Sequence, residues 1–209
     1  LDIYPPELQV ADASHVARRE WLRPVADTGS LDPAQVRLPD DPAGAPLLYV
    51  TLGTVFNEAG PLRVVVDGLR GLDVRAIVTV GPQADPAALG DPPANVVVER
   101  YVSQAAVLPQ VAAVISHAGS GTMLATLAEG HPQLCVPQGA DQFLNAAAVV
   151  ASGAGLALNP DELTADAVRE AVGRLLAEPA FRSAAARVRD SIAAMPSPDD
   201  VARLLESLT

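Results

Sequence analysis

The chain contains no lysine, and its acidic residues outnumber its basic ones. All 14 basic residues are arginines, against 25 Asp and Glu, so the formal net charge is −11 over 209 residues. Nucleic acids and anionic membrane surfaces attract positively charged proteins, and this charge therefore argues against both as partners. It also means that a phosphate ligand must be held by local hydrogen-bond donors, against the overall field of the protein.

Cysteines, aromatic residues and long apolar runs are scarce as well. The single cysteine, Cys135, excludes a disulfide within the chain, and we expect a cytoplasmic protein. No apolar run is long enough to span a membrane, and no secretory signal opens the chain. Aromatic residues make up 3% and apolar residues 49%, so the core must be built from Val, Leu and Ala.

The chain divides into three regions. Residues 1–46 are rich in proline and lack periodicity, which predicts an irregular leader or interdomain linker. Residues 47–195 carry the pattern of a folded domain, and residues 196–209 form a last helix with a capping box that starts at Ser197. The chain opens at Leu1 without an initiator Met, so we expect a fragment or an excised domain.

Within the central region, short apolar stretches alternate with helical patterns about six times. We predict strands at residues 47–52, 74–80, 95–98, 112–115, 133–136 and 155–158. We predict helices at residues 61–72, near 105–108, after Thr122, at 143–151, and in segments that contain Val168, Phe181 and Val201. This alternation predicts an α/β, Rossmann-like doubly wound parallel sheet, in which ligands bind at the carboxyl ends of the strands.

The most informative stretch runs from Val114 to Gly130 and has the pattern of a strand, a tight glycine loop and a helix. Such a loop leaves backbone N–H groups unpaired at the start of the helix, where the helix dipole adds positive charge. A phosphate is the natural ligand, although a glycine loop by itself can also serve a purely structural turn. The predicted diphosphate site consists of His117, Gly119, Ser120, Gly121 and Thr122.

Two more predicted strands end in groups that suit a ligand. Asp141 and Gln142 follow the strand at 133–136 and offer the acceptors and donors that sugar hydroxyls require. Gly53 and Thr54 follow the first predicted strand and present another backbone N–H and a hydroxyl, so we add them to the diphosphate site. A diphosphate held at one loop and hydroxyls held at the next describe a nucleotide sugar.

At this point a family resemblance becomes specific. The motif H-A-G-S-G-T from His117 and the motif P-Q-G-A-D-Q-F-x-N from Pro137 resemble the donor-binding half of family 1 GT-B glycosyltransferases. T-L-G-T from Thr51 and R-Y-V-S-Q from Arg100 stand in the same order as in that family. The chain most resembles the actinobacterial enzymes that decorate antibiotics and other natural products. The resemblance covers nearly the whole chain, but only the C-terminal half of such an enzyme.

The resemblance implies an inverting, metal-independent transfer of a sugar from a nucleoside diphosphate to a hydroxyl group of a natural-product aglycone. It places Tyr101, Val102 and Gln104 beside the nucleobase, with the Tyr101 ring in a stacking role. It assigns no catalytic residue to this chain, because the general base of the family is a His in the other domain. The chain should therefore bind donor but transfer no sugar alone, and its last helix should pack against that N-terminal acceptor domain.

Donor choice and metal independence depend on two further observations. Plant enzymes of the family carry a Glu that binds both ribose hydroxyls, and Ala125 stands at that position here, which favours dTDP-sugars over UDP-sugars. No Asp-x-Asp pair lies at a predicted strand end, since Asp40-Asp41 and Asp199-Asp200 fall in a linker and a helix start. We therefore predict a site without metal and without a cofactor.

Other readings of the same pattern remain open. A nucleotide-sugar epimerase of GT-B architecture shares the fold and the donor site, and a non-catalytic binding module would fit an isolated domain. A dinucleotide-dependent dehydrogenase is disfavoured, because no G-x-G-x-x-G follows the first strand and Gly119-x-Gly121 lacks the third glycine. His15 and His131 have no placed partner in the sequence, so we interpret both as structural or surface residues.

Overall fold

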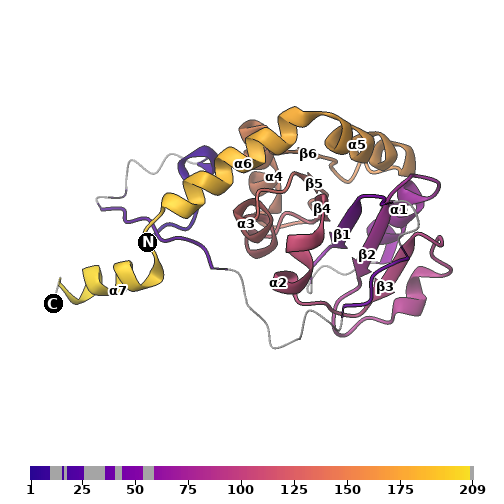
Figure 1. Cartoon of the computed structure of the whole chain (residues 1–209), viewed down its shortest axis with the longest axis horizontal. Helices are drawn as coiled ribbons and strands as arrows, with labels where there is room; N and C mark the ends of the chain where they lie inside the picture. Colours follow the sequence, from indigo (N-terminus) through magenta and orange to yellow (C-terminus); the bar gives the residue numbers. More distant parts are fainter. Residues whose placement is uncertain (10–15, 17, 26–35, 41–43, 54–58, 208–209) are drawn as a thin grey trace.

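A computed structural model describes residues 1–9, 16, 18–25, 36–40, 44–53 and 59–207 (Figure 1). At its centre is a six-stranded sheet in which each pair of neighbouring strands is parallel. The strands are β1 (Leu47–Thr51), β2 (Arg75–Thr79), β3 (Val96–Glu99), β4 (Ala113–Ser116), β5 (Gln133–Cys135) and β6 (Gly155–Ala157). Their order is β3-β2-β1-β4-β5-β6, the order of a doubly wound Rossmann fold, so the predicted fold class is confirmed.

The strands lie within one residue of their predicted ends, because each contains a short apolar run. Every residue of β1, β4 and β5 is buried, whereas most residues of the edge strands β3 and β6 are partly buried. All five residues of β1 are buried. Leu48 and Val50 join one core, and Leu47 and Tyr49 point to the opposite face and join another. This alternation places successive side chains in two separate layers of the domain.

Helices cover both faces of the sheet. They are α1 (Ala59–Leu69), α2 (Gln104–Val107), α3 (Ser120–Ala128), α4 (Gln142–Ser152), α5 (Ala165–Ala177), α6 (Pro179–Ala194) and α7 (Pro198–Glu206). The 3-10 helices are η1 (Pro6–Leu8), η3 (Pro86–Leu89) and η4 (Leu108–Gln110). Residues of α1 and α5, such as Val65 and Val168, share the core of one face, while α3, α4 and α6 share the core of the other.

One predicted helix and one predicted loop differ from the structure. The helix predicted to reach Leu72 ends at Leu69, because Gly71 adopts φ +77°, which an α-helix cannot contain. The proline-rich loop predicted before β3 contains the short helix η3, whose Asp85 side chain accepts from the Ala87 N–H. Both differences are local turns that apolar periodicity does not report.

The predicted caps of the C-terminal helices are confirmed. Thr164 accepts from the Ala167 N–H at the start of α5. At the start of α7, the Ser197 hydroxyl and the Asp200 carboxylate bond to each other's backbone N–H groups and complete a capping box.

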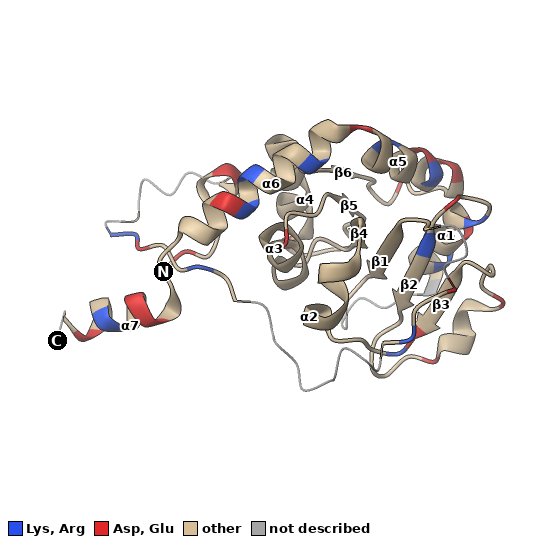
Figure 2. Ribbon diagram, viewed as in Figure 1, with Lys and Arg blue, Asp and Glu red and all other residues tan. Residues whose placement is uncertain are grey.

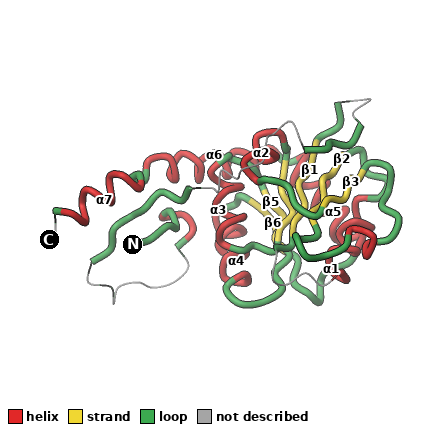
Figure 3. Tube along the Cα trace, turned by 90° about the horizontal axis from the view of Figure 1, so that it is seen from below, coloured by secondary structure: helices red, strands yellow, loops and turns green. Residues whose placement is uncertain are grey.

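Helix α7 lies at the end of the molecule opposite α1, beyond the end of α6 (Figures 1 and 3). Of its predicted apolar stripe, Val201 is buried, Leu204 is half-buried and Leu205 is 47% exposed. Leu208 is outside the described residues. The domain thus covers only the first turn of this stripe, and the packing of α7 against an acceptor domain stays a prediction.

The described parts of residues 1–25 pack on the domain. Leu8 of η1 is 1% exposed and joins the core of α3, α4 and α6, with Trp21 packed against the same core. Asp2 forms a parallel bridge with Trp21, which ties the two halves of this segment together. The leader is thus irregular in secondary structure but contributes side chains to the domain.

Charged residues lie on η1, α1, α5, α6, α7 and the connecting loops, whereas α2, α3 and α4 contain none (Figure 2). Among the residues that the structure describes, no helix has both the length and the apolar character needed to cross a membrane.

Candidate functional site

The carboxyl ends of β1 to β5 border a cleft of about 510 Å³. Every predicted site residue that the structure describes lines it. These residues are Gly53, Tyr101, Val102, Gln104, His117, Gly119, Ser120, Gly121, Thr122, Asp141 and Gln142. Thr54, the remaining predicted residue, lies outside the described residues. Side chains that are far apart in the sequence therefore share one cavity, because parallel strands place all their carboxyl ends at one edge of the sheet.

The start of α3 presents free hydrogen-bond donors to this cleft. Gly119 is the N-cap residue, and no side chain caps the helix. The first backbone bond at this end runs from the Met123 N–H to the Gly119 carbonyl, at 2.9 Å. The N–H groups of Ser120, Gly121 and Thr122 precede it and have no acceptor within the helix. This helix end can therefore accept an anion.

Two alanines hold strained backbone on either side of the cleft. Ala118, between β4 and α3, has φ 61°, and Ala140, directly before Asp141, has φ 54°. Positive φ is uncommon for a residue with a Cβ, and it costs about 1 kcal/mol or more. Among the described residues, these two are the non-glycine positions with positive φ. Strain is thus concentrated at the two loops that were predicted to bind phosphate and sugar.

The His117 ring lies between two glycines. A Cβ added to Gly53 would stand 2.7 Å from the His117 Nε2, and one added to Gly119 would stand 2.9 Å from its Cε1. Gly53 also adopts φ +84°, so a side chain at this position would be strained as well. The sequence pointed to both glycines as ligand-facing backbone, and the structure adds that they make room for the imidazole.

Burial favours the neutral form of His117. Desolvation lowers the pKa of His117 from its ordinary value of 6.5, while the Thr51 carbonyl and the Asp141 charge oppose this shift. The Nδ1 atom is buried and makes no hydrogen bond, so the Thr51 carbonyl offsets only part of the desolvation of the ring. At neutral pH the ring is uncharged, and an anion bound at Nε2 would favour its protonation.

Asp141 belongs to a hydrogen-bonded group that joins the two loops. The Ser120 hydroxyl donates to Asp141 Oδ2 at 3.0 Å, and the Asn145 amide donates to the same oxygen at 3.1 Å. The Asn145 amide also donates to the Ala118 carbonyl at 2.9 Å. Asn145 is 4% exposed and was not predicted as a site residue, although it closes the second motif. It fixes the strained turn at Ala118 to the start of α4.

Gln142 has a role inside its own loop. Its Oε1 accepts from the Gln138 N–H at 2.7 Å and the Gly139 N–H at 3.1 Å. The side chain is buried, at 4% exposure, and the Nε2 amide is the group left for a ligand. Gln142 therefore shapes the loop that carries Asp141, and it can add one donor to the site.

The predicted nucleobase residues form the other end of the cleft. Tyr101 is 49% exposed, so a face of its ring is open to stacking, whereas Val102 is buried. The Gln104 amide donates to Thr122 Oγ1 at 2.9 Å and so connects this end with the phosphate loop. The Thr122 hydroxyl keeps its own proton for a ligand.

Sequence reasoning missed the floor of the cleft. Tyr49, Thr51 and Thr79 line it from inside β1 and β2, with the Tyr49 hydroxyl 3.3 Å from Thr79 Oγ1. Thr51 and Thr79 each end an apolar strand, and a polar residue in that position was a usable signal. Among the lining residues that the structure describes, one arginine, Arg100, and one acidic residue, Asp141, are present.

His131 lies away from this cleft. It is partly buried, its Nε2 has no partner, and burial lowers its pKa. This position agrees with the structural role that was expected for it, and His15 lies outside the described residues. Within the described part of the chain, no three His, Cys, Asp or Glu side chains are grouped to hold a metal ion.

With the cleft defined, the chain can be compared with known proteins. Residues 63–208 match the sequence model of the family described as "Erythromycin biosynthesis protein CIII-like, C-terminal domain". The chain belongs to this family. The match begins inside α1 and extends through α7, so it includes Tyr101, the loop from His117 to Thr122 and Asp141, but it leaves out β1 and Gly53.

Named relatives of this CIII-like domain are actinobacterial glycosyltransferases. The chain is 40% identical over 166 residues to the elloramycin glycosyltransferase ElmGT of Streptomyces olivaceus. The aligned region covers 78% of this chain and 41% of that protein. It is 37% identical over 166 residues to 4'-demethylrebeccamycin synthase of Lentzea aerocolonigenes, and the aligned region covers 79% of this chain and 39% of that protein. The chain thus spans less than half the length of these relatives.

Among solved structures, the spinosyn rhamnosyltransferase SpnG complexed with thymidine diphosphate is similar at a TM-score of 0.85 and 29% identity. The likeness covers 97% of this chain and 55% of that one. The resemblance to the donor-binding half of a GT-B glycosyltransferase is therefore confirmed.

Proposed function

We propose that this domain binds a nucleoside diphosphate sugar, preferably a dTDP-sugar, as the donor-binding half of a glycosyltransferase that modifies a natural-product aglycone. The observation that supports this proposal most strongly is the cleft itself, which is lined by the uncapped start of α3, the His117 ring and the Asp141 loop. Their chemistry matches a diphosphate joined to a polyhydroxylated ring. Two similar proteins are glycosyl or sugar transferases by their names, the elloramycin glycosyltransferase ElmGT and the spinosyn rhamnosyltransferase SpnG, and they support the same assignment.

The diphosphate would lie against the first turn of α3. The N–H groups of Gly121 and Thr122 and the Thr122 hydroxyl would donate to its oxygens, and the helix dipole would offset part of its charge. His117 would donate from Nε2, and the bound anion would raise its pKa. These donors compensate for a chain whose net charge of −11 repels the ligand.

The sugar and the base would occupy the two ends of the cleft. Asp141 would accept from sugar hydroxyls, and the Gln142 amide would donate to one, which would orient the anomeric carbon. The Tyr101 ring would stack on the nucleobase while Val102 and Gln104 border its edge. Arg100 lies beside this end and adds the one arginine charge on the lining.

The ribose position supports a thymidine donor. Ala125 is 6% exposed and lines the cleft one helical turn after Gly121. A methyl group offers no hydrogen bond to a ribose 2′-hydroxyl, so a deoxyribose loses nothing at this position. The complex of SpnG with thymidine diphosphate agrees with this choice.

In the proposed reaction, the acceptor oxygen forms a bond to the anomeric carbon as the bond from that carbon to the diphosphate breaks. The bonding electron pair leaves with the diphosphate, where the donors of α3 stabilise the growing charge. The acceptor proton must go to a base. Among the described lining residues the one histidine is His117, which Gly53 and Gly119 enclose, so we assign the base to an acceptor domain outside this chain.

Calorimetric titration of the 209-residue chain with dTDP and with UDP tests the assignment. We expect both to bind at one site, with dTDP the tighter of the two, and we expect ADP to bind more weakly. Failure of all three to bind would refute the proposed function, and a clear preference for UDP would refute the donor assignment alone.

A further inference from the structure

Tyr4, a residue of the irregular leader, connects the starts of α3 and α4. Its hydroxyl lies 2.6 Å from Ser120 Oγ and donates to Asn145 Oδ1 at 3.0 Å. Tyr4 and Asn145 are 141 residues apart in the sequence. Ser120 belongs to the proposed diphosphate loop, and Asn145 donates to Asp141, the proposed sugar ligand. One hydroxyl from the leader therefore contacts both loops of the site from behind.

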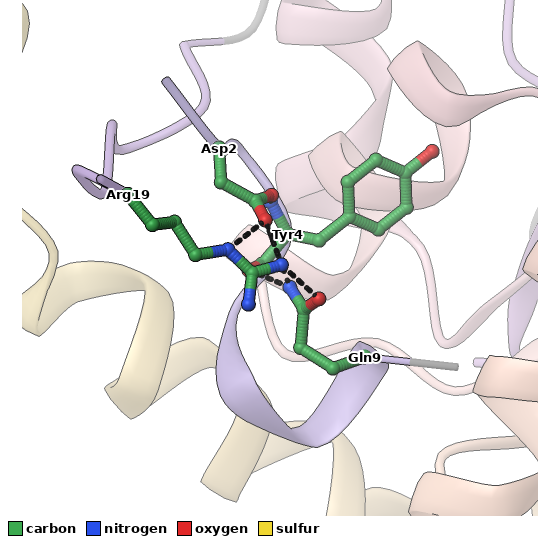
Figure 4. Close-up of polar contacts among 4 residues, drawn as sticks. All are labelled: Asp2, Tyr4, Gln9 and Arg19. Carbon is green, nitrogen blue, oxygen red and sulfur yellow. Dashed lines mark hydrogen bonds and ion pairs between the residues drawn. The ribbon is translucent and has the colours of Figure 1, made fainter. Parts of the chain in front are cut away.

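A polar clamp fixes the backbone of Tyr4 (Figure 4). Asp2 accepts from the Tyr4 N–H at 2.8 Å, and the Gln9 amide donates to the Tyr4 carbonyl at 2.7 Å. Arg19 bonds to both Asp2 and Gln9, and its guanidinium lies 4.8 Å from the centre of the Trp21 ring. Figure 4 shows the Tyr4 ring directed away from the clamp. The clamp thus sets where the hydroxyl reaches.

The protons of this network are fewer than its contacts. The Asn145 amide has two protons and three contacts, with the Ala118 carbonyl at 2.9 Å, Asp141 Oδ2 at 3.1 Å and Ser120 Oγ at 3.3 Å. The first two partners are acceptors only and lie nearer, so we assign the two protons to them. Three other contacts need a proton from a hydroxyl group, from Tyr4 to Asn145, between Tyr4 and Ser120, and from Ser120 to Asp141. The Tyr4 and Ser120 hydroxyls supply one proton each, so two protons serve three contacts and one contact is always empty.

We propose that Tyr4 is a positioning residue for the donor sugar, an inference that rests on the proposed function. A sugar hydroxyl that donates to Asp141 supplies the missing proton. The Ser120 hydroxyl then turns to Tyr4, Tyr4 donates to Asn145, and every acceptor of the network is satisfied. Sugar binding at Asp141 is coupled in this way to the hydrogen bonds of Tyr4 in the leader, and this coupling is lost when the Tyr4 hydroxyl is removed.

The test is Tyr4→Phe in the full 209-residue chain, with two measurements. The first is the ratio of the affinities for dTDP-glucose, used as the probe, and for dTDP. We expect Tyr4→Phe to lower this ratio by about three- to tenfold, the factor of one neutral hydrogen bond, and to change dTDP affinity less. The second is hydrogen exchange of the Met123 and Asn145 amides without ligand, which should lose protection relative to the amides of β1.

Leu8→Val is the matched control, because Leu8 packs from the same leader without a polar contact to the network. It should lower the melting temperature and leave the affinity ratio and the exchange of both amides unchanged.

Three outcomes overturn the inference. An unchanged ratio in a folded Tyr4→Phe protein shows that the hydroxyl has a structural role at most, whatever the exchange data show. An equal change of the ratio in Leu8→Val shows that loss of leader packing is the cause. Unchanged exchange shows that Tyr4 does not order the loops. If the wild-type chain binds neither probe, the proposed function is refuted, and exchange alone then decides whether Tyr4 orders the loops.

Discussion

Replacing Gly119 with alanine tests whether the phosphate site depends on the His117 ring. Gly119 has φ −62° and ψ 138°, a conformation open to alanine, so the substitution introduces no backbone strain. A Cβ at this position would stand 2.9 Å from His117 Cε1 and 3.2 Å from Cδ2. Both distances are too short for carbon atoms in contact, so the ring must move. The cost therefore comes from one identified side chain.

The size of the effect follows from what the ring does. If the ring stays, overpacking should lower the free energy of unfolding by about 1–3 kcal/mol. If the ring leaves, the diphosphate loses a charge-assisted hydrogen bond of about 1–3 kcal/mol, which lowers dTDP affinity by roughly 5- to 150-fold. His117→Ala removes the same bond directly and should lower the affinity by the same range.

Four proteins measured by calorimetry with dTDP and by urea unfolding decide the matter: wild type, Gly119→Ala, His117→Ala and the double variant. The double variant should bind dTDP as His117→Ala does, because the methyl group has no ring left to displace. Gly121→Ala is the control for the loop, since a Cβ at this position meets nothing within 4 Å. It should gain up to about 1 kcal/mol of stability from helix propensity.

Additive losses in the double variant would refute the reasoning, because they would show that Gly119 acts independently of the ring. Unchanged dTDP affinity in His117→Ala would remove His117 from the diphosphate site.

Four further predictions concern metal, pH, donor choice and catalysis. Chelators should leave dTDP affinity unchanged in isothermal titration calorimetry, because the N–H donors of α3 offset the phosphate charge. A loss of affinity that magnesium restores would contradict this prediction. Burial holds the pKa of His117 and of His131 below 6.5 in the fold, so the unfolded chain takes up protons first. The free energy of unfolding, measured by urea titration, should therefore fall as the pH drops through 6.5 and stop falling below the pKa values of the folded protein. The decline should be smaller in His117→Asn; an equal decline would show that His117 is not a source of this pH dependence. Ala125→Glu should raise UDP affinity relative to dTDP by about tenfold through a bond to the ribose hydroxyls, and a competition titration that shows no change would place the ribose elsewhere. The purified chain should transfer no sugar in a product assay, because general acid–base catalysis contributes about 10²–10⁴-fold and its base lies outside. Sustained transfer would send the search for a base back to the acids near Asp141.

The secondary structure and the edge of the sheet that carries the site were accessible from the sequence. Each strand is a short apolar run such as β1, and apolar periodicity and caps such as Thr164 mark the helices. These signals depend on residues that are close in the sequence, so they can be recognised without knowledge of the fold. Because parallel strands align their carboxyl ends, the positions of Gly53, Tyr101, His117 and Asp141 after predicted strands were enough to place them together.

The ends of elements and the roles of individual atoms were less accessible. Gln142 was predicted to bind sugar, yet its Oε1 is held by Gln138 and Gly139. Gly53 was predicted to present backbone, yet its lack of a Cβ also makes room for the His117 ring. Motif letters report which groups are present, but they do not report which lone pairs and protons the protein itself has already used.

The leader, residues 1–46, shows most clearly what the sequence predicts and what only the tertiary structure shows. Its prolines and lack of periodicity predicted irregular structure, and within the described residues its secondary structure is limited to the short helix η1 and the bridge between Asp2 and Trp21. Nothing local indicated that the Tyr4 hydroxyl would reach Ser120 and Asn145. Sequence patterns determined where strands, helices and the site edge lie, because those follow from the chain's nearest neighbours. Only the tertiary structure decided which distant side chains share protons, because that depends on how the helices pack in space.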